Sequence, residues 1–528
     1  MKCDGLTDDS SALQSALNSA QATVGNASVI MPPGTCIVDP AATVTINSGL
    51  WLQGAGRNGT TLRRKNSSAG GFILKLAADG ISLSDFAIDG NKGGAGITAN
   101  ADSISVASPS NGVSIQRMNL INATGNDIIS NTTGSGVYVS NWLIADNEFD
   151  NQGSSACGAS IACANILIRQ PLGLRVLRNR SNGSQHFVVF TSVPGGGLVE
   201  VGNNTVMNVN GFGIALGGGP VGSAGANVHH NFITTSTLDP YNLIDLASWS
   251  DFTVDHNILY HNGQSAANGS SGCIVSFAPG TNGVIDGNEC YSAPTSAVVV
   301  NGISVGTSDT TISSNHVRGC SAAGIAVVVG TQGLQRSVKI IGNSTKNNST
   351  QVAGAHAGIE LVPPQGSGSV PALMDILIQN NHSYDDQAAQ TQGYGIGLGL
   401  KGQTSNFSNV IVEGNDVAGN LTGGIFNNAT IAGFVLRNNF GFNPIGAINT
   451  PAFPSPTAGA TTNNTGDDVM VYITAGAKPI SIAINGVTLT GVTVPAGAAG
   501  APIRLSANQN ITLSYTAGGA PAWQWIGD

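Results

Sequence analysis

One short pattern, a valine or isoleucine followed three positions later by an asparagine, recurs along most of this chain. Copies stand at Ile88–Asn91, Ile144–Asn147, Val176–Asn179, Val201–Asn204, Val228–Asn231, Val254–Asn257, Ile285–Asn288, Ile312–Asn315, Ile340–Asn343, Ile378–Asn381, Val412–Asn415 and Val435–Asn438. A degenerate copy, Ile115–Met118, falls between the first two. The twelve steps from Asn91 to Asn438 average about 29 residues, a period typical of solenoid proteins.

Each repeat also carries a second short strand, of the form Gly-(Ile/Val)-x-(Leu/Val), as at residues 213–216, 324–327 and 358–361. Strands this short cannot bury their apolar faces alone, but stacked coils bury them in one continuous core. An asparagine at the same bend of every coil can hydrogen-bond to the coils above and below. The pattern therefore predicts an all-β chain folded as a parallel β-helix with an asparagine ladder.

The start of the chain supplies a cover for the open end of this stack. Asp8 or Asp9 can cap a helix on which Leu13 and Leu17 lie four apart on one face. We therefore expect a capping helix at the N-terminal edge, which would otherwise expose unpaired strands.

The composition excludes several classes of protein. Only 9% of the residues are charged while 41% are hydrophobic, which argues against a disordered chain. The net charge of −9 argues against a nucleic-acid partner, and no apolar run is long enough to cross a membrane. The first five residues do not read as a signal peptide, so a secretion signal was either removed or never present.

Seven cysteines leave at least one thiol unpaired within the chain. Cys3 can pair with Cys36, and Cys157 can close a small ring with Cys163. For Cys273, Cys290 and Cys320 the role of small buried thiol is an equal alternative. This usage modestly favours an oxidising, extracellular setting.

The repeat stops after Asn438, and the sequence then changes character. We expect the β-helix domain to span residues 1–446, a proline-rich linker 447–456, and a small β-sandwich module 457–528. In this module, Trp523 and Trp525 are expected to lie in the core rather than in an exposed sugar-binding face.

The N-terminal segment resembles a known family. Asp-Gly-Leu-Thr-Asp-Asp at residues 4–9, Ala-Leu-Gln at 12–14 and Met-Pro-Pro-Gly-Thr at 31–35 resemble the start of pectate-lyase-like right-handed β-helix proteins. A short strand that usually opens this segment is missing. The resemblance implies a right-handed β-helix of about 13 coils. It also implies a carbohydrate-active protein, since lyases, hydrolases, epimerases and phage tail depolymerases share the scaffold. The C-terminal module resembles those of bacterial and phage β-helix proteins.

In the Gly-Ile-x-Leu strands, alternation predicts that the glycine and x positions point outward and form a groove. The aligned strands place Asp127, Asn165 and His186 in the glycine column. Arg169 is expected in the next outward column beside Asn131 and Phe190. Asp245 occupies the x column, the loop before it carries Asp239 and Tyr241, and Tyr260 and His261 are expected to line the edge.

The expected roles depend on the reaction. In lyase-type cleavage, our first choice, His186 or Tyr241 would be the base and Arg169 would neutralise a uronate carboxylate. In a glycoside hydrolase, the close alternative, two carboxyls flank the bond. Asp127 lies four coils from Asp245, about 19 Å, which is too far, whereas Asp239 could pair with Asp245.

A third hypothesis is a non-catalytic glycan-binding tail protein or adhesin. The partner is a polysaccharide in every case, and the protein is expected outside the cell or on a virion, as a monomer or homotrimer. No cofactor is required by the pattern and no metal ligands are assigned, but Ca²⁺ is left open as a source of the positive charge that this groove lacks.

For two further groups of polar residues, a role as ordinary surface side chains is an alternative to a functional role. The residues around His229-His230 and Asp255-His256, with Asp286 beyond, are expected to form stacked surface pairs rather than a metal site. Glu360 is predicted to point outward, either as a distant subsite or as a solvated side chain.

Overall fold

The computed structural model describes all residues except 23–26, 67–70, 98–100, 108, 131–136, 151–162, 192–196, 218–222, 236–240, 263–270, 278, 294–298, 330–333, 363–372, 400–405, 443–449, 457–458, 467, 517–520 and 528. The chain divides into two compact units. Unit 1 contains residues 1–327 and 348–352, and unit 2 contains residues 328–347 and 353–528. The predicted domain boundaries at 446 and 457 stay predictions.

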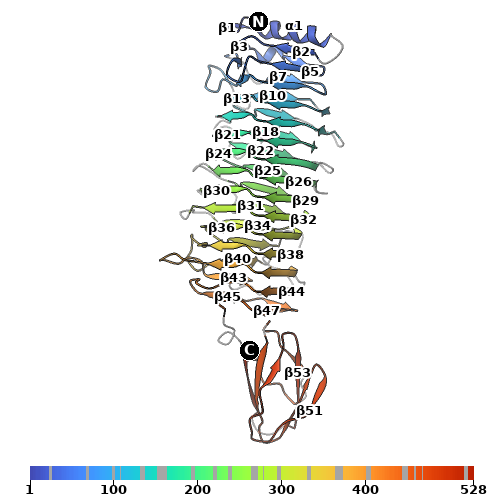
Figure 1. The fold of residues 1–528 in the computed structure, drawn as a ribbon, viewed down its shortest axis with the longest axis vertical. Coiled ribbons are helices and arrows are strands. Elements are labelled where there is room, and N and C mark those ends of the chain that lie inside the picture. The colour runs from blue at the N-terminus through green and yellow to red at the C-terminus, as the bar shows by residue number, and fades with distance from the viewer. Residues whose placement is uncertain are drawn as a thin grey trace. The chain divides into compact units, whose positions relative to one another are not determined.

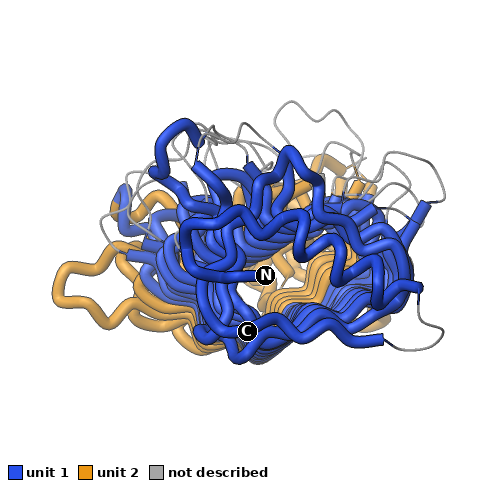
Figure 2. Tube along the Cα trace, turned by 90° about the horizontal axis from the view of Figure 1, so that it is seen from above, with its two compact units in different colours: residues 1–327, 348–352 blue, residues 328–347, 353–528 orange. Residues whose placement is uncertain are grey.

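Unit 1 is a stack of coils built from three parallel sheets, A, B and C, whose coils overlie one another in the view along the stack (Figure 1, Figure 2). Sheet A consists of β1 (Asp4–Asp8), β3 (Gly34–Val38), β6 (Thr60–Arg64), β9 (Ala87–Asp89), β13 (Asn119–Ile121), β17 (Glu148–Asp150), β21 (Arg180–Asn182), β24 (Thr205–Val209), β27 (Phe232–Thr235), β30 (Ile258–His261), β33 (Glu289–Ser292) and β36 (His316–Arg318).

Sheet B of unit 1 consists of β2 (Ala27–Ile30), β5 (Leu50–Gln53), β8 (Ser82–Ser84), β12 (Ser114–Gln116), β16 (Leu143–Ala145), β20 (Arg175–Leu177), β23 (Gly197–Gly202), β26 (Ser223–His229), β29 (Trp249–Asp255), β32 (Thr281–Asp286) and β35 (Ser308–Ser313), with the short strands β11 (Ser110–Asn111), β15 (Val139–Ser140) and β19 (Pro171–Leu172).

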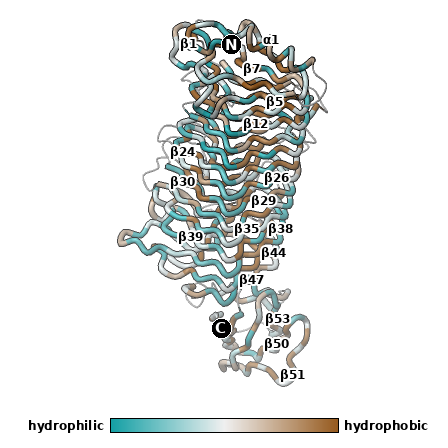
Figure 3. Tube along the Cα trace, turned by 45° about the horizontal axis from the view of Figure 1, so that its top comes forward, coloured by the Kyte–Doolittle hydropathy of each residue, from teal (hydrophilic) through white to brown (hydrophobic). Residues whose placement is uncertain are grey.

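Sheet C of unit 1 consists of β4 (Thr45–Ile46), β7 (Phe72–Leu76), β10 (Asp102–Val106), β14 (Ile128–Ser130), β18 (Ala164–Arg169), β22 (His186–Thr191), β25 (Ile214–Gly217), β28 (Ile244–Ala247), β31 (Ser271–Phe277), β34 (Val300–Val305) and β37 (Ile325–Val328). Hydrophobic stretches recur from coil to coil (Figure 3), and their inward side chains, such as Ile166, Val188 and Ile214, are fully buried.

Helix α1 (Ser10–Gln21) lies at the N-terminal end of the stack (Figure 1). Leu13 and Leu17 are fully buried, which confirms the predicted apolar face. Asp8 Oδ1 accepts the Ser10 N–H, whereas the carboxylate of the N-cap residue Asp9 makes no cap hydrogen bond. A 3₁₀ turn, η1 (Pro40–Ala42), follows the second strand of sheet A. No helix in the described part of the chain is long and apolar enough to cross a membrane.

The predicted asparagine ladder runs along the bend between sheets B and A. In unit 1, Asn204 Nδ2 donates to Asn231 Oδ1 at 2.9 Å, and Asn231 Nδ2 donates to Asn257 Oδ1 at 2.9 Å. The residue just before each asparagine takes a left-handed conformation, with φ of 52° at His230 and at His256. Each asparagine therefore satisfies polar groups that the tight bend would otherwise leave buried and unpaired.

Two copies of the pattern are not part of this ladder. Asn91 Nδ2 donates to the Arg64 carbonyl instead, because Phe86 occupies the ladder position of that coil. At the other end, Asn415 Nδ2 donates to Asn439 rather than to Asn438, which takes the left-handed position. At this bend the ladder asparagine is therefore one position later than the sequence pattern predicts.

Unit 2 contains further coils and a sandwich. Its coils use β39 (Ser344–Lys346) and β42 (His382–Tyr384) in sheet A, β38 (Gln335–Ile341), β41 (Leu373–Gln379), β44 (Asn406–Glu413), β46 (Thr430–Ala432) and β47 (Val435–Arg437) in sheet B, and β40 (Ala357–Val362), β43 (Tyr394–Leu398) and β45 (Gly423–Asn427) in sheet C.

The C-terminal strands of unit 2 form two antiparallel sheets. One contains β48 (Thr461–Thr462), β53 (Asn510–Tyr515), β50 (Ile480–Ile484) and β51 (Val487–Val494), and the other contains β52 (Ile503–Leu505), β49 (Val469–Thr474) and β54 (Ala522–Gly527). Their apolar faces share one core that includes Trp523 and Trp525. The prediction of a β-sandwich with core tryptophans is confirmed.

The cysteines are mostly paired. Cys3 bonds to Cys36 as predicted, and Cys273 bonds to Cys290, which links sheets C and A inside one coil. Cys163 is also disulfide-bonded, and Cys157 lies outside the described residues. Cys320 is a free, buried thiol, and burial raises its pKa to about 12. The paired cysteines fit an oxidising compartment.

Candidate functional site on the outer face of sheet C

The register of sheet C in unit 1 shows which residues face outward. Leu167, Val189, Ala215, Asp245 and Val275 are successive partners across five strands, and they form one outward column. The predicted outward position of Asp245 is therefore correct. The glycine column, however, faces inward.

The inward direction of the glycine column follows from its surroundings. A Cβ atom on Gly213 would lie 2.9 Å from the side chain of Ile233 on sheet A and 2.6 Å from the carbonyl of Leu243. The strand bends at the corner between sheets A and C, so simple alternation does not extend across it. Asp127 and Asn165, which share this column, point into the stack.

Asp127 and Asn165 form a buried polar pair rather than part of a groove. Both are 0% exposed, and Asn165 Nδ2 donates to Asp127 Oδ2 at 2.8 Å. The Oδ1 atom of Asn165 accepts hydrogen bonds from Ser181 and Ser184. Burial raises the pKa of Asp127 well above its ordinary value, although the Asn165 bond lowers it. We infer that Asp127 is a structural carboxyl.

His186 occupies a different outward column from the predicted one. Its partner on β18 is Ala164, one residue before Asn165. The side chain is 0% exposed, and its Nδ1 accepts the Phe212 N–H at 2.9 Å. The ring lies 5.5 Å from the ring of Phe212 and 6.3 Å from that of Tyr241. His186 is therefore a buried residue that packs against the aromatic rings of Phe212 and Tyr241.

Phe212 and Tyr241 are both half-buried and form a stacked pair with ring centroids 4.9 Å apart, and the Tyr241 hydroxyl is buried. The main chain of Tyr241 is held from sheet A by His261, whose Nε2 lies 3.1 Å from the Tyr241 carbonyl. Burial lowers the pKa of His261 to about 4, so its imidazole is neutral and donates this bond. His261 is a buried positioning residue at the end of β30, not an edge residue of the groove.

Asp245 follows Tyr241 by four residues, and its partner on β25 is Ala215, three residues after Phe212. Its carboxyl is only 8% exposed, and Asn242 Nδ2 donates to its Oδ2 at 2.6 Å. Asn242 is fixed in turn, because its Oδ1 accepts the Gly272 N–H at 3.0 Å. Burial raises the pKa of Asp245 to about 6, against the lowering effect of Asn242. A carboxyl with this pKa can both give and take a proton near neutral pH.

An apolar strip occupies the outer face next to Asp245. Ile129, Ala164, Leu167, Val189 and Ala215 form a cluster separate from the main core, with Phe72 and Phe212 packed against it. This strip contributes to the apolar surroundings that disfavour a charged carboxylate.

Three predicted site residues are placed elsewhere. Arg169 ends β18 and is exposed, and its partner on β22 is Thr191 rather than Phe190. Phe190 faces the core and is 0% exposed. Three strand steps separate β18 from β28, so Arg169 lies about 14 Å along the stack from Asp245. Tyr260 is on sheet A, where its ring contacts Phe232 and Tyr291. Asn131 and Asp239 lie outside the described residues.

Several residues of the outer face were not among the predicted site residues. Phe212 and Asn242 in unit 1, and Tyr394 in unit 2, all stand just before the glycine position of a sheet C strand. That outward column was the available signal. Placing Phe187 rather than His186 at the glycine position of β22 would have put His186 in this column and revealed the cluster.

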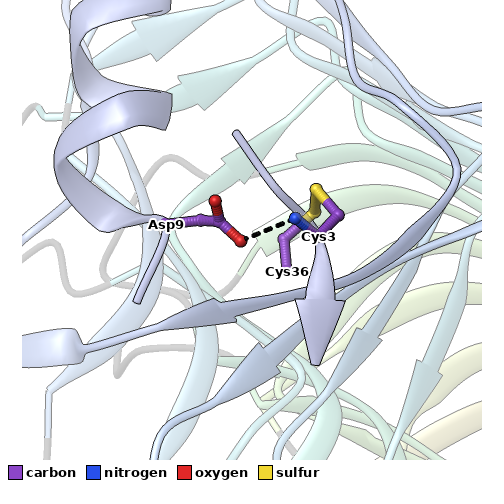
Figure 4. Close-up of side chains that lie close together, drawn as sticks. All are labelled: Cys3, Asp9 and Cys36. Atoms are coloured by element: carbon purple, nitrogen blue, oxygen red, sulfur yellow. Dashed lines mark hydrogen bonds between the residues drawn. A yellow bond between two sulfur atoms is a disulfide. The ribbon is translucent and has the colours of Figure 1, made fainter. Parts of the chain in front are cut away.

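The one group of three potential metal ligands among the described residues is Cys3, Asp9 and Cys36 (Figure 4). Both sulfurs form a disulfide, and the Asp9 carboxylate accepts the N–H groups of Lys2 and Cys3. These three residues therefore do not fit a metal ion. Ca²⁺ takes six to eight oxygen ligands, and the described residues around Asp245 do not offer such a set. Participation of Ca²⁺ stays a prediction.

The histidines at the bend form surface stacks, as expected. The rings of His230 and His256 are 5.2 Å apart and nearly parallel, and His256 Nδ1 lies 2.9 Å from Asp255. His229 lies 3.1 Å from Glu200, and Asp286 accepts a bond from Ser313.

Two family matches cover much of the chain. Residues 1–182 match the family described as rhamnogalacturonase A/epimerase, pectate lyase-like, and residues 188–363 match the right handed beta helix region. No curated protein matches in sequence. The sheets and ladder define a right-handed parallel β-helix protein. With the N-terminal match, residues 1–182 are similar to the pectate-lyase-like family of such proteins.

Solved structures share this fold at low sequence identity. The pre-mature gene product 12 of bacteriophage phi29 is 17% identical, with a TM-score of 0.53 over 83% of this chain and 55% of its own. The mannuronan C-5 epimerase AlgE6 A-module of Azotobacter vinelandii is 19% identical, with a TM-score of 0.41 over 84% and 97%. A mutant tailspike protein of E. coli bacteriophage HK620, in complex with a pentasaccharide, is 11% identical, with a TM-score of 0.47 over 100% and 90%. At these identities the likeness concerns the fold alone.

Proposed function

We propose that this chain is a polysaccharide-cleaving enzyme whose reaction takes place on the outer face of sheet C around Asp245. One observation carries the proposal: Asp245 points out of the stack yet is only 8% exposed, and the stacked pair Phe212 and Tyr241 belongs to the same outer face, with Tyr241 four residues before Asp245. Aromatic faces carry partial negative charge and attract the C–H groups of a sugar ring. The site thus combines a sugar platform with an acid or base.

Hydrolysis is the chemistry that this arrangement supports best. A protonated Asp245 would donate its proton to the leaving glycosidic oxygen, and a second carboxylate would activate water or attack the sugar. Asp239, six residues before Asp245, is the proposed second carboxylate. The spacing of the two carboxyls would then decide between retention, at about 5–5.5 Å, and inversion, at about 6.5–9.5 Å.

Lyase-type cleavage, the first choice from sequence, is the second candidate. It would use Tyr241 as the base, but the Tyr241 hydroxyl is buried and would have to be uncovered to reach a substrate. It is weakened because Arg169 is about 14 Å away along the stack, and because His186 is fully buried. A lyase would need another cation to neutralise the uronate carboxylate.

The test is a cleavage assay on pectic, alginate, plant-wall and bacterial polysaccharides, with the products weighed by mass spectrometry. We expect oligosaccharides that have gained one water, and we expect Asp245→Asn to lose this activity. Asp309→Asn is the matched control, because Asp309 is an exposed aspartate on sheet B away from the site. Products that have gained no water and carry a double bond would establish the lyase instead.

Absence of cleavage across the whole panel would overturn the proposal. It would favour a non-catalytic glycan-binding protein, which we expect outside the cell or on a virion. Light scattering after gel filtration would then separate a monomer from a homotrimer.

A further inference from the structure

A second pocket lies in unit 2, on the outer face of sheet C. Its walls include Glu360 on β40, Tyr394 on β43 and Phe426 on β45, and His356 lies at its rim just before β40. All of these residues belong to unit 2.

The register explains why a hollow forms here. Glu360, Gly397 and Phe426 are partners on three successive strands of one outward column. Gly397 has no side chain, so a gap remains between Glu360 on one side and Phe426 on the other. Two strand spacings make this gap about 9.6 Å between backbones. A Cβ on Gly397 would already come within 3.3 Å of Ala357, so the gap depends on glycine.

Two aromatic rings form one side of the gap. The ring centroids of Tyr394 and Phe426 are 5.0 Å apart, and both side chains are half-buried. Half-buried rings keep one face available to a ligand. The apolar C–H face of a pyranose ring is the complement of such a surface.

The opposite side holds a fixed carboxylate. Glu360 is 7% exposed, and its Oε1 accepts the Ala357 N–H at 2.7 Å and lies 3.3 Å from His356 Nδ1. Burial lowers the pKa of His356, but the hydrogen bond and charge of Glu360 outweigh this effect, so the pKa is raised. A carboxylate offers about four lone-pair positions, so these donors leave room for ligand hydroxyls.

We propose that this pocket binds one sugar residue that has free hydroxyls and no carboxylate. The aromatic pair would receive its C–H face, and Glu360 would accept hydrogen bonds from its hydroxyls. A uronate would bring a second negative charge to Glu360, with only His356 to offset it, and would be rejected. The inference does not depend on catalysis at Asp245, so either proposal can fail without the other.

The experiment is ligand-observed NMR with the full chain and three matched pairs of probes. Each pair is a hexose and its uronate: glucose with glucuronate, galactose with galacturonate, and mannose with mannuronate. We expect at least one hexose to bind, and its uronate to bind at least tenfold more weakly. If no hexose binds, or if the uronate binds equally well, the proposal is overturned.

Variants assign the binding to this pocket. Phe426→Ala and Glu360→Gln should each weaken hexose binding at least tenfold. Glu360→Gln keeps an oxygen acceptor for the Ala357 N–H, so the coil should stay folded. Tyr384→Ala, on sheet A of unit 2 and stacked on His382, is the aromatic control and should bind as the unmodified chain does. Hexose binding that survives both pocket variants would place the sugar elsewhere and sink the assignment.

Discussion

Asp245 in unit 1 and Glu360 in unit 2 occupy the same position of equivalent strands. Each is the third residue of a four-residue stretch, Leu243–Leu246 in one case and Gly358–Leu361 in the other, and each points outward from sheet C. Their exposures are also alike, at 8% and 7%. Position and burial therefore do not distinguish these two carboxyls.

Their hydrogen-bond donors differ. Asp245 receives one bond from a neutral side-chain amide, that of Asn242, and burial holds its pKa at about 6. Glu360 receives a main-chain N–H and lies beside a histidine whose pKa is raised. The donors thus suit Asp245 to exchanging a proton, whereas they hold the Glu360 side chain in one position. The comparison teaches that the donors, rather than the strand position, set the chemistry.

The largest expected effect is a difference in cleavage rate between variants of the two carboxyls. Asp245→Asn should lower the cleavage rate by about 10²–10⁴-fold, the usual contribution of a general acid or base. Glu360→Gln should raise KM while changing kcat less than about threefold, because binding contacts act on both substrate and transition state. Steady-state kinetics on the substrate found in the panel measure both values. A large loss of kcat in Glu360→Gln would reverse the two roles.

A second prediction concerns stability and pH. The folded-state pKa of Asp245, about 6, lies above the ordinary value of 3.8, so the folded protein holds this proton more tightly. The resulting stabilisation is full below pH 3.8 and is lost as pH rises through 6. The difference of about two pKa units corresponds to about 3 kcal/mol.

Asp245→Asn should therefore gain stability relative to the unmodified chain as pH rises from 4 to 8. Urea unfolding midpoints of the two proteins across this range measure the effect, with Asp309→Asn as the control. A difference that is independent of pH would show that Asp245 is ionised in the folded protein throughout.

The smallest effect concerns His356. Glu360→Gln removes the negative charge and the acceptor that raise the pKa of His356, so this pKa should fall. The His356 imidazole signals in an NMR titration report the change. An unchanged pKa of His356 would mean that Glu360 and His356 do not interact in solution. The hydrogen-bond donors of Glu360 and Asp245 would then differ less than the structure indicates.

The fold was largely predictable because one residue type repeats at one bend. Asn204, Asn231 and Asn257 satisfy buried polar groups that the bend itself creates, so their spacing in sequence reports the coil. The copies of the pattern that end at Asn91 and Asn438 were predicted wrongly, because these two asparagines do not occupy the ladder position of a bend.

The outer face of sheet C was less predictable, for a physical reason. Alternation holds within a strand but not through the corner that precedes it, so Asp127 and Asn165 were assigned to the wrong side of the sheet. Phe190 was likewise taken as a neighbour of Arg169, although a single residue of register separates core from surface there. Asp245 was placed correctly because it lies inside its strand.

The left-handed bend before each ladder asparagine has a consequence for how such a protein can change. Successive ladder asparagines in unit 1 are separated by 32, 25, 27, 26, 31 and 27 residues, yet the bend keeps the same form, one left-handed residue followed by the asparagine. Variation in coil length is therefore taken up in the strands and at the other corners, including those beside sheet C. The ladder bend between sheets B and A is thus constant in length, whereas the corners beside sheet C vary. Insertions at these corners can change the binding surface while the coils stay in register.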